Sequence, residues 1–406
     1  MKIHVWVPEY AFSTGGIQTL SRFLVRALHD QLPDAKLRIV AKNDTSVPDL
    51  GRIDIADFSS VGCWVPSQRT LAFTFELFRR ALRERPDLII VTHVNFAPVA
   101  SWLKKISGIP FIALGNGIEV WEIPSRSIRH ALRNADGLVA ISEFTRQRMA
   151  TALNISPDAI LKLPCTFSPE NFRPSAKPHF LLKRYDLSND QPVILTIARL
   201  ASAERYKGYD QVLRALLIVR KQFPDVRYIL GGRGSDRRRV MKLIEELGLL
   251  ENVILVGHIP EHELCAHYNL CDVFAMPSKG EGFGIVFLEA MACGKPVIAG
   301  NKDGSVDPVL DGKLGVLVDP DDIDHIGEAI LGILERQIES EAQSLGTGRR
   351  GTATGVSIPE IVFDPDALRR EVIAMYGYGR FLERVADIVR RFVQDISTWP
   401  AATLHN

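Results

Sequence analysis

The sequence predicts an α/β protein built on two doubly wound parallel sheets, and three observations support this fold class. Short runs rich in Val, Ile and Leu alternate along the chain with amphipathic helical stretches. The runs show little alternation of polar and apolar residues, which is typical of parallel strands covered by helices on both faces. The alternation occurs in two series, and a proline-rich stretch from Pro164 to Pro178 separates them.

The first series contains six predicted strands and the second contains five. The predicted strands of the first series span residues 3–7, 37–41, 88–91, 111–114, 137–141 and 160–163. Those of the second series span residues 193–198, 227–230, 253–256, 273–276 and 296–299. Apolar residues at helical spacing predict helices at 18–29, 209–222 and 378–394.

The proline-rich stretch is the predicted domain boundary, because a residue that precedes proline is biased toward an extended conformation. We therefore expect domains at 1–175 and 176–380, followed by a terminal segment at 381–406. Residues 340–357 contain no aromatic residue and many Gly, Ser and Thr, which predicts a surface loop.

Composition excludes several classes of protein. The 406 residues are 46% hydrophobic and 24% charged, which is ordinary for a globular chain and excludes disorder throughout. The five cysteines form no C-x-x-C pair, which argues against a structural zinc site and favours buried, reduced thiols. The apolar start of the chain is too short for a secretory signal, so we expect a cytoplasmic protein.

Charge is distributed unevenly between the halves of the chain. The formal net charge is +1, so the whole-protein charge does not favour binding to nucleic acid. Residues 1–180 carry 22 Lys and Arg against 16 Asp and Glu, a net of +6, and the remainder carries a net of −5. The two halves are therefore expected to face different partners.

The strongest chemical signal is a pair of carboxylates, Glu281 and Glu289, that flank a loop and the start of a predicted helix. The loop contains Gly284, and a helix start exposes backbone N–H groups and the positive end of the helix dipole, which suits a phosphate or a sugar hydroxyl. Glu281 can accept from sugar hydroxyls, and Glu289 can accept from the two ribose hydroxyls. The alternative is that Glu281 is solvated and Glu289 pairs with a neighbouring base.

The second signal is a pair of cations, Arg199 and Lys207, that follow the first strand of the second series. Ligands of doubly wound sheets bind at the carboxyl ends of strands. A planar guanidinium and a mobile ammonium together could neutralise a diphosphate leaving group. A surface salt-bridge cluster with Glu204 and Asp210 explains the same residues equally well.

Two glycine-containing segments follow predicted strands. Gly15 and Gly16 lie between the first strand and the first helix, where glycine allows close approach to a phosphate or serves an ordinary tight turn. The segment 231–234 lacks the full G-x-G-x-x-G pattern, so a nicotinamide site is disfavoured. His93 follows another strand, and a structural role is its default.

Taken together, these residues resemble the retaining family-4 glycosyltransferases of the GT-B fold. The resemblance is strong over residues 190–320 and weaker over 1–175. It rests on motifs in a fixed order, which are Gly15-Gly16, Arg199 with Lys207-Gly208, Gly231 to Gly234, and Glu281-x7-Glu289 followed by Ala290-Met291-Ala292-Cys293-Gly294-Lys295-Pro296. The stretches Ser142-Glu143-Phe144-Thr145 and Phe172-Arg173-Pro174 also match the family.

The resemblance implies two Rossmann-like domains that face a cleft, with a nucleotide-sugar bound there and a C-terminal helix crossing back to the first domain. Arg199 and Lys207 would hold the donor diphosphate, and Glu281 would contact the donor sugar. The implied nucleotide-sugar contacts further include Gly16, Asn116, Ile259, Glu261, Phe283, Gly284, Ile285 and Glu289. Asn116 departs from the family, which commonly places a histidine there; asparagine can bind a hydroxyl but cannot titrate near neutrality.

The resulting hypothesis is a retaining, metal-independent hexosyltransferase that uses a GDP- or UDP-hexose and requires no cofactor beyond this substrate. Arg199, Lys207 and the helix terminus at Gly284 would stabilise the departing diphosphate, with Glu281 at the donor sugar. No acidic D-x-D cluster lies where a metal bridge would need it, since Asp319-Pro320-Asp321 falls in a late loop. The alternatives are an epimerase or phosphorylase on the same fold, or an inactive subunit that binds a nucleotide-sugar.

The acceptor is expected on the first domain. Its net positive charge suits an anionic lipid-linked saccharide or a growing cell-surface polysaccharide, with peripheral contact to the inner face of the plasma membrane. Arg126, Arg129 and Arg133 lie at helical spacing and could face anionic lipid, although a solvated helix face explains them as well. Glu261 could accept from guanine, which favours a guanosine donor slightly.

Overall fold

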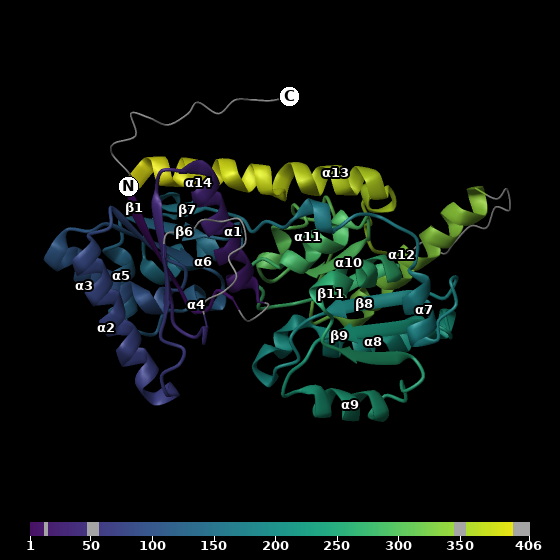
Figure 1. Cartoon of the computed structure of the whole chain (residues 1–406). Helices are drawn as coiled ribbons and strands as arrows, with labels where there is room; N and C mark the ends of the chain where they lie inside the picture. Colours follow the sequence, from purple (N-terminus) through teal and green to yellow (C-terminus); the bar gives the residue numbers. More distant parts are fainter. Residues whose placement is uncertain (12–14, 47–56, 345–354, 393–406) are drawn as a thin grey trace. The chain divides into compact units, whose positions relative to one another are not determined.

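The computed structural model describes residues 1–11, 15–46, 57–344 and 355–392 (Figure 1). The chain forms two compact units: unit 1 comprises Met1–Cys165 and the chain from Gly379 on, and unit 2 comprises Thr166–Tyr378. The functional domain boundaries expected after residues 175 and 380 stay predictions.

Unit 1 is built on a seven-stranded sheet in the order β3-β2-β1-β4-β5-β6-β7, in which every pair is parallel. The strands are β1 (Lys2–Val7), β2 (Lys36–Ala41), β3 (Asp57–Ser60), β4 (Leu88–Val91), β5 (Phe111–Gly115), β6 (Gly137–Ala140) and β7 (Ile160–Lys162). Strands β4, β5 and β6 are buried along their whole length, as the apolar runs predict.

The helices of unit 1 are α1 (Gly16–Gln31), α2 (Pro66–Glu84), α3 (Ala97–Ser107), α4 (Ile118–Trp121), α5 (Arg126–Arg133), α6 (Glu143–Leu153) and α14 (Tyr378–Phe392). Serine side chains cap two of them, because Ser125 Oγ accepts from Ile128 N–H and Ser142 Oγ accepts from Thr145 N–H. Helix α14 belongs to unit 1, although it follows unit 2 in the sequence. The Phe381 ring lies 6.5 Å from the Phe23 ring on α1, which confirms the expected crossover helix.

Unit 2 is built on a six-stranded parallel sheet in the order β10-β9-β8-β11-β12-β13. The strands are β8 (Val193–Ile197), β9 (Arg227–Gly231), β10 (Val253–Gly257), β11 (Val273–Met276), β12 (Val297–Gly300) and β13 (Val316–Val318). The helices are α7 (His179–Tyr185), α8 (Tyr209–Gln222), α9 (Arg237–Glu246), α10 (Glu261–Leu270), α11 (Ile285–Ala292), α12 (Ile323–Ser344) and α13 (Pro365–Tyr376).

The fold class is confirmed, and the differences from the expected elements are local. Strands β3 and β13 were not predicted, because they are short and β3 has a polar sequence, Asp57-Phe58-Ser59-Ser60. The loop expected at 340–357 begins too early, since α12 continues to Ser344. Residues 345–354 of that loop and 393–406 of the terminal segment lie outside the described residues.

Within the described ranges, no helix combines the length and apolar character that crossing a bilayer requires.

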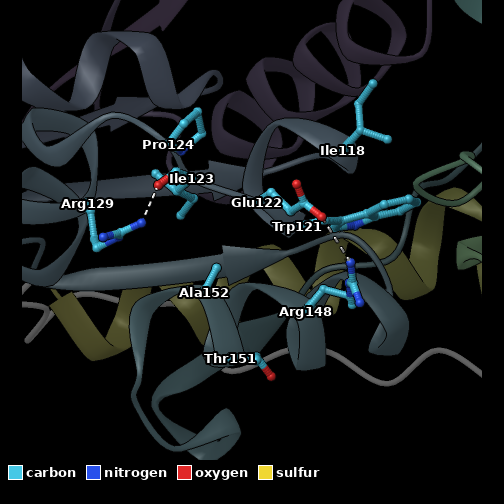
Figure 2. A pocket seen from close by; sticks show the side chains of 9 residues that line it. All are labelled: Ile118, Trp121, Glu122, Ile123, Pro124, Arg129, Arg148, Thr151 and Ala152. Carbon is cyan, nitrogen blue, oxygen red and sulfur yellow. Dashed lines mark hydrogen bonds and ion pairs between the residues drawn. The ribbon is translucent and has the colours of Figure 1, made fainter.

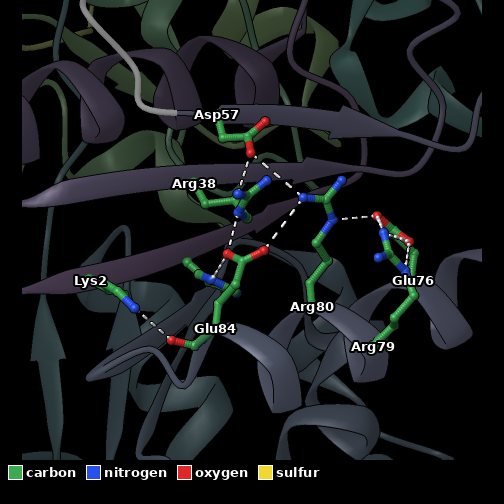
Figure 3. Close-up of polar contacts among 8 residues, drawn as sticks. Lys2, Arg38, Asp57, Glu76, Arg79, Arg80 and Glu84 are labelled. Carbon is green, nitrogen blue, oxygen red and sulfur yellow. Dashed lines mark hydrogen bonds and ion pairs between the residues drawn. The ribbon is translucent and has the colours of Figure 1, made fainter.

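A network of polar and charged side chains, most of them partly buried, joins β1, β2 and α2 in unit 1 (Figure 3). Glu84 near the end of α2 receives hydrogen bonds from Arg38 on β2 and from His4 on β1, the latter at 3.1 Å. Arg38 also pairs with Asp57, and Arg80 lies 3.4 Å from Glu84. Burial lowers the pKa of His4 to about 4, although the Glu84 carboxylate opposes the shift; the charges of Arg38 and Arg80 lower it further.

We predict that His4 makes the stability of unit 1 depend on pH. A histidine in the unfolded chain protonates near pH 6.5, whereas His4 in the folded unit stays neutral down to about pH 4. Stability is therefore lost as the pH falls below 6.5, and this group contributes about 2 kcal/mol of loss between pH 7 and pH 5. Urea unfolding of His4→Gln at both pH values should show a smaller loss than the wild type.

The matched control is His29→Gln, a partly exposed histidine on α1. This variant should keep the wild-type difference between pH 7 and pH 5. If His4→Gln and the wild type lose the same free energy, His4 is not the titrating group.

Candidate functional site

The candidate site of unit 2 lies where the strand order of its sheet changes direction. From β8 the chain continues outward to β9 and β10 on one side, and β11 then pairs with β8 on the other side. The carboxyl ends of β8 and β11 are therefore neighbours, and ligands of doubly wound sheets bind at such a switch point. Arg199 and Lys207 follow β8, and Glu281 follows β11.

Lys207 and Glu281 form a direct ion pair, although 74 residues separate them in the chain. Lys207 Nζ donates to Glu281 Oε2 at 2.5 Å, and the two side chains are 15% and 20% exposed. Burial by itself would lower the pKa of Lys207, but the charge and hydrogen bond of Glu281, with the nearby Tyr206 and Glu204, raise it above its ordinary value. Lys207 thus stays a cation, held at the carboxyl end of β8.

Backbone contacts fix this pair. Gly208 has φ +83°, and a Cβ there would lie 2.3 Å from the carbonyl oxygen of Pro277, so the close approach of the two loops requires glycine. Lys279 N–H donates to the Tyr206 carbonyl at 2.9 Å and joins the same loops again. The position of Lys207 is therefore set by main-chain packing.

Arg199, the other predicted cation, is not paired with Glu281. Its Nη2 lies 2.9 Å from Glu204 Oε1, and its side chain is 68% exposed. The salt-bridge alternative therefore describes Arg199 in this structure. The exposed guanidinium remains available to a ligand at the same loop.

Asp303, which is not among the predicted site residues, holds the Glu281 loop. It follows β12 and is fully buried. Asp303 Oδ2 accepts from the Glu281 backbone N–H and from Ser278 Oγ, each at 2.7 Å, and Oδ1 accepts from Ser305 N–H at 2.9 Å. Burial raises the pKa of Asp303 despite these hydrogen bonds. The position of Asp303 four residues after the predicted strand 296–299 is the sequence signal that could identify it.

The loop after Glu281 leads into the N-terminus of α11, as predicted. Gly284 caps this helix with φ +94°, a conformation that disfavours any residue with a Cβ. Phe283 is buried, and its ring lies 5.5 Å from the Tyr376 ring. The anchored Phe283 and Gly284 direct the first amides of α11, beginning with Ile285, toward the carboxyl edge of the sheet.

Glu289 lies further along α11, where it accepts a hydrogen bond from Tyr268 on α10 at 2.7 Å. Burial raises the pKa of Glu289 to about 7; the Tyr268 hydrogen bond lowers it, and the charge of Glu261 raises it. Glu261 is exposed in the first turn of α10, and Ile259 just before that helix is buried. Helices α10 and α11 thus carry the predicted nucleoside contacts.

The candidates Gly16 and Asn116 belong to unit 1. Gly16 is exposed and begins α1. Asn116 is nearly buried after β5, and its Nδ2 donates to the Thr92 carbonyl at 2.9 Å. Its Oδ1 is buried and has no hydrogen-bond partner among the residues that the structure describes. An acceptor oxygen without a partner suits a ligand hydroxyl. His93 Nδ1 accepts from Asn95 N–H, which supports the structural role.

Unit 1 also contains a hollow of about 670 Å³ (Figure 2). It is lined by Ile118, Trp121, Glu122, Ile123, Pro124, Arg129, Arg148, Thr151 and Ala152. Arg129 Nη2 donates to the Ile123 carbonyl at 2.5 Å, and its buried Nε has no partner within the described ranges. Arg148 is half-exposed and lies 4.0 Å from Glu122. Across the described parts of both units, no cluster of three or more His, Cys, Asp or Glu side chains could hold a metal ion.

The comparisons with known proteins match both halves of the chain. Residues 180–349 match the family "Glycosyl transferases group 1", and residues 14–170 match "Glycosyltransferase Family 4". The chain belongs to the group 1 / family 4 glycosyltransferases. A GDP-mannose-dependent alpha-(1-6)-phosphatidylinositol monomannoside mannosyltransferase of Mycolicibacterium smegmatis is 36% identical over 236 residues, which are 55% of this chain and 60% of that relative. The chain thus matches about three fifths of that relative's length.

Solved structures match almost the whole chain. HepE of Anabaena, crystallised with UDP, superposes with a TM-score of 0.74 at 18% identity, over 96% of this chain and 100% of that one. Sucrose-phosphate synthase of Thermosynechococcus elongatus gives a TM-score of 0.74 at 20% identity, over 96% and 99%. The fold is therefore GT-B.

We predict that Asp303→Ala destabilises unit 2 by about 3 kcal/mol, because buried donors of Ser278, Glu281 and Ser305 lose their acceptor. The free energy of unfolding in urea measures this loss. Glu328→Ala on the exposed side of α12 is the control and should change the free energy by no more than about 0.5 kcal/mol. Equal stability of the two variants would contradict the role of Asp303.

Proposed function

We propose that the chain transfers a hexosyl group from a nucleotide diphosphate sugar to a hydroxyl of a saccharide or lipid-linked acceptor. The observation that carries this proposal is the Lys207–Glu281 pair at the switch point of the unit 2 sheet, beside the N-terminus of α11. A cation, a carboxylate and helix amides at one sheet edge provide the groups that a sugar diphosphate needs.

The barrier to transfer is departure of the diphosphate from an oxocarbenium-like sugar. Lys207, the exposed guanidinium of Arg199 and the first amides of α11 would stabilise the developing negative charge without a metal. Glu281 is held by Lys207 and Asp303, and its remaining acceptor positions would receive donor-sugar hydroxyls. Membership of the family supports retention at the anomeric carbon, with the acceptor attacking from the face that the diphosphate leaves.

The donor is proposed to be GDP-mannose or a related GDP-hexose. The mycobacterial relative is named for GDP-mannose. Glu261 is exposed at the start of α10 and could accept from the N1–H and N2–H of guanine. Glu289 would accept from the ribose, and Ile259 would pack near the base.

The acceptor is proposed to contact unit 1. The relative acts on a phosphatidylinositol mannoside according to its name. The hollow beside α4 and α6 combines apolar walls with Arg129 and Arg148, which suits an anionic amphiphile. Asn116, with its unpartnered oxygen, lies two residues before the first lining residue, Ile118.

Unit 1 also presents an apolar and basic face that supports peripheral contact with the cytoplasmic side of a membrane. Leu71 and Phe75 on α2 are 75% and 67% exposed, and Trp102 and Ile106 on α3 are 68% and 64% exposed. Each pair is spaced by four residues and lies on one side of its helix, and α2 contacts α3. Exposed cations, including Lys105, accompany them. This membrane face has the composition of an interfacial helix surface.

The proposal is tested by a thermal-shift panel of UDP-, GDP- and ADP-sugars, followed by analysis of products and of the anomeric configuration. GDP-mannose should raise the melting temperature most, and release of GDP should require an acceptor. Release of a sugar phosphate would indicate a phosphorylase, and a changed donor sugar would indicate an epimerase. Tight binding without turnover over a broad acceptor panel would indicate an inactive binding subunit.

We predict that Lys207→Ala lowers kcat/KM by about 10²- to 10³-fold and weakens donor binding, because the departing diphosphate loses a buried cation. Lys242→Ala, at an exposed position of α9, is the control and should retain wild-type kinetics. A melting curve without ligand verifies folding of both variants. Unchanged transfer by a folded Lys207→Ala would refute the diphosphate assignment.

We predict that donor affinity falls about tenfold between pH 8 and pH 6, because only ionised Glu289 accepts from both ribose hydroxyls and its pKa is about 7. Calorimetric titration with GDP-mannose in the absence of acceptor measures the affinity. Glu289→Gln should bind weakly at every pH and lose this dependence, whereas Glu245→Gln, at an exposed position of α9, should keep it. A pH-independent affinity in the wild type would contradict the ribose role.

We predict that the double variant Leu71→Glu with Phe75→Glu reduces binding to phosphatidylinositol-containing vesicles at least about tenfold, since two exposed apolar side chains no longer enter the bilayer surface. Co-sedimentation measures the bound fraction. Leu250→Glu, at an exposed position of unit 2, is the control. Equally poor binding of the wild type to anionic and neutral vesicles would exclude the membrane face.

A further inference from the structure

We propose that Cys265 and Cys293 form a reversible disulfide that weakens nucleotide binding, so that the pair is an oxidative modification site. The two sulfur atoms lie 3.9 Å apart, in contact but unbonded, in unit 2. The effect on nucleotide binding rests on the proposed function, whereas formation of the disulfide does not.

The pair joins the two helices that carry the predicted nucleoside contacts. Cys265 lies on α10, and Cys293 is the C-terminal cap of α11. Cys293 N–H donates to the Glu289 carbonyl at 3.2 Å, so Cys293 lies one helical turn from the ribose carboxylate. Cys265 precedes Tyr268 by three residues, and Tyr268 donates to that same carboxylate.

Cys265 has the environment of a reactive thiol. It is partly exposed, and Asn269 Nδ2 donates to its sulfur at 3.4 Å. The hydrogen bond from Cys293 lowers the pKa of Cys265 to about 6 against the opposing effect of burial, with help from Asn269 and the charge of Arg173. The lowered pKa increases the fraction of Cys265 that is thiolate, the form that reacts with oxidants.

Cys293 is suited to the role of the resolving thiol. It is 1% exposed, so an oxidant in solution reaches the pair through Cys265. Its hydrogen bond to Cys265 and its burial raise its pKa, so it remains a thiol until Cys265 has reacted. Cys271 is less suited, because burial raises its pKa to about 12 and its sulfur donates to the Tyr268 carbonyl.

The chemistry requires a peroxide such as hydrogen peroxide. The Cys265 thiolate attacks one peroxide oxygen, the O–O bond breaks, and hydroxide leaves, which gives a sulfenic acid. The Cys293 sulfur then attacks the sulfenic sulfur, the S–O bond breaks, and the thiol proton leaves with the hydroxyl group as water. A dithiol reductant supplies two electrons and two protons and restores both thiols.

Disulfide formation must move the helices. The sulfur separation shortens from 3.9 Å to about 2.0 Å, and the C–S–S–C torsion must approach a right angle. Asn269 Nδ2 on α10 donates to the Arg173 carbonyl at 2.9 Å, and this hydrogen bond opposes a shift of α10 as a whole when the Cys265 sulfur moves toward Cys293. The strain falls on the segment between Cys265 and Tyr268 and on the last turn of α11, which alters the Tyr268–Glu289 hydrogen bond.

The test combines disulfide mapping with nucleotide binding. The full chain is treated with hydrogen peroxide at neutral pH, digested without reduction, and searched by mass spectrometry for the 265–293 cross-linked peptide. GDP affinity is measured before oxidation, after oxidation and after dithiothreitol. We expect the cross-link to form, GDP affinity to fall about tenfold, and dithiothreitol to restore it. GDP bound in advance should slow cross-linking.

Cys293→Ser and Cys265→Ser should retain GDP affinity after peroxide treatment, and Cys63→Ser, which replaces an exposed thiol, should behave like the wild type. Absence of the cross-link while Cys63 oxidises would overturn the proposal. A cross-link that leaves GDP affinity unchanged would overturn its regulatory part. Failure of the reduced wild type to bind any nucleotide would instead contradict the proposed function, because the cross-link is scored independently.

Discussion

The pairing of β8 with β11 is the constraint on which the candidate site of unit 2 depends. All strands of this sheet run parallel, so their carboxyl ends share one edge, and the change of strand order places two distant loops side by side there. Lys207 and Glu281 meet only because of this pairing. Gly208 then allows the loops to approach within the contact distance of backbone atoms.

Because Lys207 and Glu281 meet at this edge, both of their charges are largely buried there. Burial by itself would lower the pKa of Lys207, and the Glu281 carboxylate opposes this effect; the Asp303 carboxylate in turn holds the backbone of Glu281. The three groups form a chain of donors and acceptors from β8 across β11 to β12. Such preorganised charge is most effective when it faces developing charge on a ligand, which is why the pair carries the proposed transfer.

The packing of α10 against α11, the two helices with the predicted nucleoside contacts, also brings two thiols into contact. Helices α10 and α11 are held together by the Tyr268–Glu289 hydrogen bond, and Cys265 and Cys293 lie one turn away from it. The proposed donor contacts and the proposed thiol chemistry therefore share one structural element. In unit 1, by contrast, apolar side chains of α2 and α3 are exposed in the described part of the chain. Exposed apolar side chains of this kind are typical of an interaction surface.

The sequence by itself determined the architecture, because parallel strands buried on both faces leave short continuous runs of Val, Ile and Leu that need no tertiary context to be recognised. It also indicated the helix start at Gly284 and the family, whose motifs are local. Only the tertiary structure decided which side chains meet. Glu281 pairs with Lys207 and not with Arg199, and Asp303 supports the loop, because strand order and not sequence distance brings charges together. The short strands β3 and β13 and the contact between Cys265 and Cys293 were likewise invisible in the sequence, since each depends on neighbours that are remote along the chain.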